Sequence, residues 1–130
     1  MVEFAFVLPL LLMLLVGIWS TARAWNVHNV MDHAAREAAR HGATVEPWNG
    51  SSPTAVRAVA DAALSASRVN LGLVSHCIAM GANPCNADPT NLVSDDVVAV
   101  TLMYPNYPLD FVFFSTEVDL EVSAIARYES

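Results

Sequence analysis

The sequence predicts an α+β fold, in which one long N-terminal helix packs on a small antiparallel sheet of about three strands plus a short helix. Three observations lead to this prediction. Nineteen uncharged residues run from Phe4 to Ala22. An alanine-rich, charged segment follows with no Gly or Pro between Ile18 and Arg40, which favours one continuous helix. Near the C terminus, apolar and polar residues alternate as they do in half-buried strands.

The uncharged run is long enough to cross a membrane. A helix rises about 1.5 Å per residue, so the run spans about 28 Å, close to the hydrocarbon thickness of a bilayer. We therefore divide the 130 residues into three parts. Residues 1–24 form a membrane or filament-core helix, and residues 25–42 form its amphipathic continuation, which ends near Gly42. Residues 43–130 form one small α+β globular domain.

The globular domain begins with a loop over 43–53, rich in Pro, Gly and Ser. Pro53 is a favourable first residue for a helix over 53–67. Its expected buried face consists of small and β-branched side chains at helical spacing, namely Ala55, Val59, Ala62, Ala63 and Ala66.

Three strands complete the domain. Alternation predicts a first strand from Val69 to about His76, followed by a long loop over 77–94. The segment DVVAVTLMY over 96–104 is rich in Val, Thr and Tyr and predicts the second strand. Residues 117–128 predict the third, with one face directed inward and formed by Val118, Leu120, Val122 and Ala124.

Composition excludes several function classes. The formal net charge is −7, and all six basic residues are Arg, so the chain lacks the basic face that nucleic-acid binding requires. Neither a G-x-S-x-G motif nor a phosphate-binding glycine motif occurs, and no serine has a plausible His and Asp pairing. We therefore expect no enzymatic activity and no cofactor.

Two cysteines, Cys77 and Cys85, bracket the segment IAMGANP. In an exported protein this spacing indicates one local disulfide that closes a turn. The alternative is two buried free thiols. Two cysteines alone are too few for a structural zinc site.

Metal binding has weak candidates only. Asp88, Asp95 and Asp96 lie in a loop rich in Asn and Asp, and calcium takes oxygen ligands from such loops. The EF-hand spacing is absent, however, and the same residue types form ordinary turns. His33, Glu37 and His41 share one helix face but have no evident fourth ligand. We expect no metal site.

The N-terminal segment allows three interpretations. A cleaved signal peptide needs a basic start, which Met1, Val2 and Glu3 do not supply. A simple signal anchor gives Glu3 no role, and Pro9 is unusual within one. The third interpretation is a helix that leaves the bilayer and packs against copies of itself. It gives Glu3 a role, because a carboxylate beside an apolar helix is costly to bury unless it meets a cation such as a neighbour's amino terminus.

The third interpretation agrees with a family resemblance. The run VEFAFVLPLLLMLLVGI, followed by DHAAREAARHGA, resembles the TadE family of pilin-like proteins from Tad (Flp-type) pilus systems, within the type IV pilin class. The shared features are the Val-Glu-Phe-Ala start with Glu3 and Phe4, then Pro9, Gly17 and the Ala-Ala-Arg-Glu-Ala-Ala-Arg segment over 34–40. The C-terminal pair of alternating strands and the Ala-Arg-Tyr-Glu ending are also similar. The resemblance implies a type IV pilin-like fold.

The resemblance also implies a function. The chain would be a structural pilin-like subunit, main or minor, of a Tad-type filament. It would wait in the bacterial inner membrane and then become part of an extracellular pilus. Its partners would be copies of itself, other pilins, the pilus assembly machinery and a prepilin peptidase. Glu3, Phe4, Pro9 and Gly17 would then serve assembly and axial register. The alternative is a membrane-anchored extracytoplasmic binding or accessory domain that stays in the inner membrane.

One feature departs from the pilin pattern. In type IV pilins the glutamate usually falls at the fifth mature position, after a short basic leader. Here it is third and no leader precedes it. We expect one of two explanations. Either residue 1 of this numbering lies inside the usual mature N terminus of a pilin, or the mature N terminus of this chain is shorter than usual.

Two further sets of residues are candidates for packing. Ala34, Ala35, Ala38 and Ala39 form a narrow stripe that allows another helix to approach closely. The apolar cluster of Phe111, Val112, Phe113 and Phe114 has two interpretations. It closes the core under a long loop, or it is an exposed patch that a neighbouring subunit covers.

Overall fold

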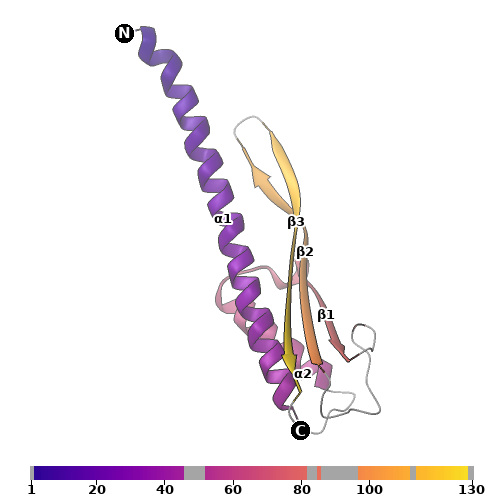
Figure 1. The fold of residues 1–130 in the computed structure, drawn as a ribbon. Helices are drawn as coiled ribbons and strands as arrows, with labels where there is room; N and C mark the ends of the chain where they lie inside the picture. Colours follow the sequence, from indigo (N-terminus) through magenta and orange to yellow (C-terminus); the bar gives the residue numbers. More distant parts are fainter. Residues whose placement is uncertain (1, 46–51, 82–84, 86–96, 112–113, 129–130) are drawn as a thin grey trace.

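The computed structural model describes residues 2–45, 52–81, 85, 97–111 and 114–128 (Figure 1). The helices are α1 (Val2–Thr44) and α2 (Ser52–Ala66), with a 3₁₀ turn η1 (Leu71–Leu73). The strands are β1 (Ser75–Met80), β2 (Val97–Asp110) and β3 (Ser115–Arg127). The predicted α+β layout is confirmed: a long helix packs on a three-stranded antiparallel sheet plus a short helix.

Helix α1 is one continuous element, and it runs through Pro9 without interruption. It extends two residues beyond Gly42, near which the sequence predicts its end, and stops at Thr44. The Thr44 hydroxyl donates to the carbonyl of His41 (2.9 Å). This bond satisfies one of the carbonyl groups that a helix terminus leaves without an intrahelical partner.

The sheet has the order β1-β2-β3, and both neighbouring pairs are antiparallel. Strand β2 is longer than the predicted 96–104 and includes Pro105 and Pro108. Pairing with β1 reaches only as far as Met103, so one edge of β2 is open beyond that residue. Proline is tolerated at such an edge because its missing N–H breaks no ladder bond there.

A bulge between Tyr104 and Tyr107 shifts the register of β2 against β3. At this bulge Asn106 has a φ of 54°, a left-handed conformation that Asn tolerates better than most residues. Its N–H donates to the carboxylate of Asp119 on β3 (2.9 Å). The hairpin thus continues past the bulge as a β2–β3 arm.

The predicted first strand over 69–76 is wrong in position. Asn70 accepts a hydrogen bond from the N–H of Gly72 (3.1 Å) and caps the 3₁₀ turn η1. A side-chain bond of this kind competes with strand formation, because it offers the backbone a local partner. Strand β1 therefore begins at Ser75 and includes Cys77, which the sequence analysis places in a loop.

The core lies between the second half of α1, helix α2 and the inner face of the sheet. Val98, Val100 and Leu102 supply its β2 layer, and Val122 and Ala124 supply the inward face of β3 as predicted. The predicted buried face of α2 is wrong. The prediction chose the face with the most alanines, but the buried face is the one that carries Val56 and Leu64, in a row spaced by four residues that begins at Ser52 and includes Ala60. The buried residues of α2 are Ser52, Val56, Ala60 and Leu64.

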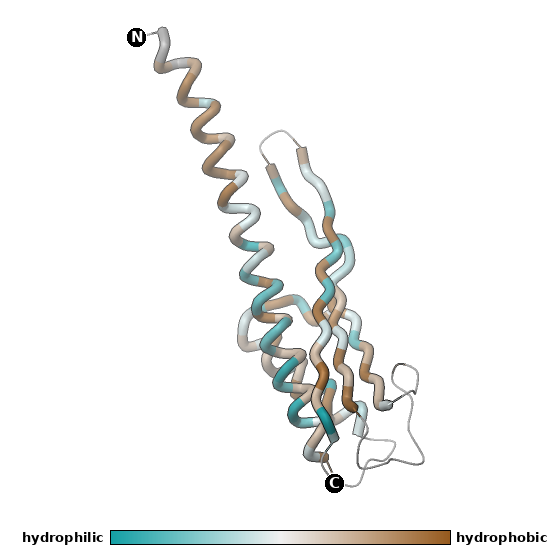
Figure 2. The backbone as a smooth tube through the Cα atoms, viewed as in Figure 1, coloured by the Kyte–Doolittle hydropathy of each residue, from teal (hydrophilic) through white to brown (hydrophobic). Residues whose placement is uncertain are grey.

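The overall shape is elongated. In Figure 1 the first half of α1 projects beyond the body of the globular domain, and the β2–β3 arm rises beside the helix toward the N terminus. Figure 2 shows the first half of α1 as predominantly hydrophobic and its second half as mixed, with many hydrophilic residues.

Candidate functional site

The first half of α1 exposes an extended apolar surface. Twelve large hydrophobic residues between Phe4 and Trp19 are exposed, and Phe4 has the largest exposed fraction, at 80%. The helix is long and apolar enough to cross a membrane, and no residue of its most apolar window is buried. The exposed residues are Phe4, Phe6, Val7, Leu8, Leu10, Leu11, Leu12, Leu14, Leu15, Val16, Ile18 and Trp19.

The alanine stripe lies in the second half of the same helix. Ala34, Ala35, Ala38 and Ala39 are at most 1% exposed within the single chain. They belong to the hydrophobic core, where α1 packs against α2, β2 and β3. Their small side chains let these elements approach the helix axis closely. The stripe is therefore occupied by the chain's own domain.

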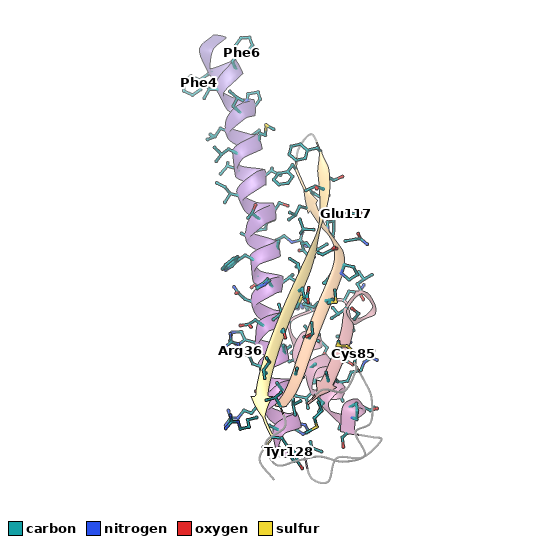
Figure 3. The ribbon with its side chains drawn as sticks, turned by 45° about the vertical axis from the view of Figure 1, so that its right-hand side comes forward. Phe4, Phe6, Arg36, Cys85, Glu117 and Tyr128 are labelled. Atoms are coloured by element: carbon teal, nitrogen blue, oxygen red, sulfur yellow. A yellow bond between two sulfur atoms is a disulfide. The ribbon has the colours of Figure 1, made fainter. Side chains whose placement is uncertain are left out.

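The residues expected to serve assembly lie along the exposed half. Glu3 is in the first turn of α1, and its side chain lies outside the described part of the structure. The Phe4 side chain is exposed near the end of the helix (Figure 3). Pro9 is exposed within the helix, and Gly17 is partly buried. None of the described residues of this set, Phe4, Pro9 and Gly17, belongs to the hydrophobic core of the domain.

Gly17 meets the end of the β2–β3 arm. A Cβ placed at Gly17 would lie 3.6 Å from Cδ1 of Phe111. The rings of Phe111 and Phe114 stack with centroids 4.7 Å apart, and the Phe111 N–H donates to the Phe114 carbonyl (2.9 Å). We call this pair, Phe111 and Phe114, the hairpin tip. Val112 and Phe113, the other members of the predicted cluster, lie outside the described residues.

The hairpin tip is partly packed and partly free. Phe111 is half-buried, whereas Phe114 is 56% exposed. Beside this contact, Phe111 and α1 line an apolar groove with a volume of about 690 Å³. Its other lining residues come from the helix and are Leu14, Gly17, Ile18, Thr21, Ala22 and Trp25.

A cavity with several polar lining residues shares Ala22 with the groove and extends farther toward the globular domain. This second pocket, of about 460 Å³, lies between α1, the segment after α2, and β2. Among its lining residues are Arg23 and Asn26 of α1, and Arg68 and Asn70 of the following segment. The surface thus changes from apolar to polar at about Ala22, which lines both cavities.

Cys77 of β1 and Cys85 form a disulfide, with Cα atoms 4.9 Å apart. It anchors one end of the segment after β1 to the sheet, on the side of the domain away from the hairpin tip (Figure 3). Asp88, Asp95 and Asp96 lie outside the described residues. Within the described ranges, no three His, Cys, Asp or Glu side chains come together as metal ligands.

A buried polar contact joins α2 to β1. The His76 side chain is 2% exposed, and its Nε2 lies 2.9 Å from Oδ1 of Asp61. Burial holds the pKa of His76 below its usual range and outweighs the opposite effect of the Asp61 carboxylate, while Arg57 lowers it further. This contact lies in the globular domain, away from the exposed apolar surface, and its role is to hold α2 against β1.

Two features of this surface were not predicted from the sequence. Trp19 and Trp25 are 70% and 68% exposed at the end of the apolar run, and tryptophan in that position is a recognisable sign of a membrane interface. The contact between Gly17 and Phe111 gave no sequence signal, since it joins residues distant in the chain and depends on the length of the β2–β3 arm.

Comparison with known proteins gives one match. Searches of curated proteins and of solved structures find no match for this chain. Residues 1–40, which cover α1 almost to its end, match the family model described as TadE-like protein. The predicted resemblance is therefore confirmed for the helix that carries the exposed apolar surface and the alanine stripe.

Proposed function

We propose that this chain is a pilin-like subunit of a Tad-type pilus, held in a membrane by the first half of α1 before assembly. The observation that carries the proposal is the exposed apolar surface from Phe4 to Trp19 on a helix that matches the TadE-like family model. Burying one large apolar side chain away from water lowers the free energy by about 1.5–3 kcal/mol. Twelve such residues on one helix therefore require cover from outside the chain.

A membrane and a filament core would both provide this cover. The apolar run has the length of a bilayer's hydrocarbon layer, so the same surface can face lipid first and neighbouring helices later. The alanine stripe is already occupied by the domain, so neighbouring copies would pack on the first half of α1 and not on the second. The domains would then lie on the outside of the filament. The proposed role is mechanical and includes no enzymatic activity.

Glu3 would set the axial register between copies. A carboxylate inside an apolar bundle is stable only with a cationic partner, and a neighbour's terminal amine can supply one. Pro9 lacks the N–H that would bond to the preceding turn, which makes that part of α1 easier to bend during transfer from membrane to filament.

The experiment compares Glu3→Gln with Glu37→Gln, a matched change at an exposed position of the same helix. Membranes and sheared surface filaments are collected from cells that express each variant, and mass spectrometry quantifies this chain in both fractions. We expect Glu3→Gln to remain in the membrane but to be lost from the filaments, and Glu37→Gln to enter both. Normal filament entry of Glu3→Gln would contradict the register role.

The same experiment tests the alternative function. An anchored extracytoplasmic domain would appear in the membrane fraction and never in the filaments, even as the unmodified chain. That result would overturn the proposed function. Abundant copies in filaments would identify a main subunit, and trace copies a minor one.

A further inference from the structure

We infer that the hairpin tip is a second membrane contact, which inserts into the leaflet on the side of the globular domain while α1 spans the bilayer. This inference rests on the membrane-anchored stage of the proposed function. It adds an interaction surface, formed by the tip and the groove beside it, and a partner, the acyl chains of that leaflet.

The hairpin tip meets α1 within the uncharged part of the helix. Phe111 packs against Gly17, which lies within the uncharged run Phe4 to Ala22. From Gly17 to Arg23, the first charged residue after the run, the helix rises about 9 Å. A helix that spans the bilayer through its apolar run therefore places the tip below the polar boundary of the leaflet.

Two tryptophans of α1 mark that polar boundary independently. Trp19 and Trp25 are strongly exposed on α1, and exposed tryptophans concentrate where hydrocarbon meets headgroups. The pocket that contains Arg23 and Arg68 shares Ala22 with the groove and extends along α1 to Val30, farther toward the globular domain than the groove, which ends at Trp25. Its guanidinium groups suit the phosphate level of the leaflet. The tip lies on the apolar side of these markers.

The lining of the groove beside the tip is largely apolar. Only one of its lining residues carries a hydroxyl, Thr21, and that hydroxyl donates to the carbonyl of Gly17 (3.0 Å). A polar group that is satisfied within its own helix is compatible with hydrocarbon. Both described residues of the tip are phenylalanines, and Figure 2 shows the described ends of the β2–β3 arm as hydrophobic. Acyl chains can therefore fill the groove without leaving its hydroxyl unpaired.

Charges near the tip are placed as an interface requires. Asp110 precedes the tip and lines a pocket of about 290 Å³ that extends along α1 from Val16 to Arg23, so an arginine of the helix is available on the domain side of this carboxylate. Glu117 projects from β3 on the domain side of the tip (Figure 3). Asp110 and Glu117 thus lie at the base of the apolar tip, and interfacial segments with an apolar and a charged part enter a leaflet by about 5–10 Å.

The test uses the full chain, with the Cys77–Cys85 disulfide kept oxidised, in phosphatidylcholine and phosphatidylglycerol vesicles. Phe114→Cys carries an environment-sensitive fluorophore. Ile125→Cys is the matched control, because Ile125 is also an exposed apolar residue of β3 but lies beside Arg36 and Arg40 in the second half of α1. Leu11→Cys reports on the span itself. Quenching is measured with lipids that carry a nitroxide near the headgroup and with aqueous iodide.

We expect the probe at Phe114→Cys to be quenched several-fold more strongly by the nitroxide lipid than the probe at Ile125→Cys, and to be protected from iodide. Equal quenching of the two probes, with Leu11→Cys still quenched by lipid, would overturn the inference and leave the proposed function standing. Loss of lipid quenching at Leu11→Cys would overturn the proposed function instead. Protection at Phe114→Cys that rises with protein density and shows no lipid quenching would mean that a second copy covers the tip, which also overturns the inference.

Discussion

The two halves of α1 have the same backbone conformation but opposite relations to the rest of the chain. The first half carries large apolar side chains that remain exposed from Phe4 to Trp19. The second half buries small side chains, the alanine stripe, against α2 and the sheet. The domain packs on the half of the helix that carries the alanine stripe, and the stripe's small side chains leave room there for the larger buried side chain of Met31. Side-chain size therefore separates the surface that folds the subunit from the surface left for external partners.

The largest expected effect comes from truncating one side chain in each half. Met31→Ala should lower the free energy of unfolding by about 2–5 kcal/mol, because Met31 is fully buried and its loss leaves a cavity. Leu12→Ala, at an exposed position of the first half, should change it by less than about 0.5 kcal/mol. Denaturant titration in detergent micelles, followed by near-ultraviolet circular dichroism, measures both. Equal changes in the free energy of unfolding for the two variants would contradict the difference between the two halves of α1.

Enlarging the alanine stripe should give the next largest effect. Ala35 is fully buried, so Ala35→Leu should destabilise the domain by about 1–3 kcal/mol through overpacking. Ala62→Leu makes the same change on the exposed face of α2 and serves as the control. Thermal unfolding of the two variants should differ clearly. A neutral Ala35→Leu would mean that the contact between α1 and the domain is looser than the burial of the stripe indicates.

The stability of the globular domain should also depend on pH, through His76. Its pKa in the folded chain is lowered by burial, so the unfolded chain takes up the proton first when the pH falls below about 6.5. Stability should be unaffected by this group above that pH and decrease below it, until the folded-state pKa is reached. One proton limits the slope to about 1.4 kcal/mol per pH unit.

The measurement is the free energy of unfolding at a series of pH values between neutral and mildly acidic. His76→Gln should flatten the dependence relative to the unmodified chain. An unchanged slope in His76→Gln would assign the pH dependence to other groups.

The smallest expected effect concerns the point where the exposed half meets the β2–β3 arm. A Cβ at Gly17 falls at ordinary contact distance from Phe111, so Gly17→Ala should keep the hairpin tip in place. Gly17→Leu should displace the ring, since its longer side chain enters the same space. Both are good helix formers, so their global stabilities should agree within about 0.5 kcal/mol. Faster hydrogen exchange at Phe111 in Gly17→Leu alone would confirm the contact.

Much of this architecture follows from local patterns. The uncharged run, the alanine stripe and the alternation in β3 each identify an element without reference to its neighbours, and the structure contains all three. The full length of β2 could not be predicted, because Pro105 and Pro108 argue against a long strand unless one edge of it is known to lack a paired strand beyond Met103. The error in α2 had a different cause, since its buried stripe is set by where Val56 and Leu64 meet the core.

The candidate site was predictable in part for the same reason. Glu3, Pro9 and Gly17 are recognisable from their spacing along one helix. The aromatic cluster over 111–114 was recognisable from composition, but its partner was not. That partner depends on how far the β2–β3 arm extends past the bulge at Asn106, which is a property of the whole sheet.

The most direct test of the central claim compares the full chain with a chain that begins at Ser20, the first residue to be buried among those of α1 whose burial is described. If the first half of α1 exists for external partners, its removal should leave the free energy of unfolding of the domain within about 0.5 kcal/mol of the full chain, measured in the same detergent. A loss of cooperative unfolding, or a decrease of more than about 2 kcal/mol, would show that the apolar half stabilises the subunit itself and would contradict the account.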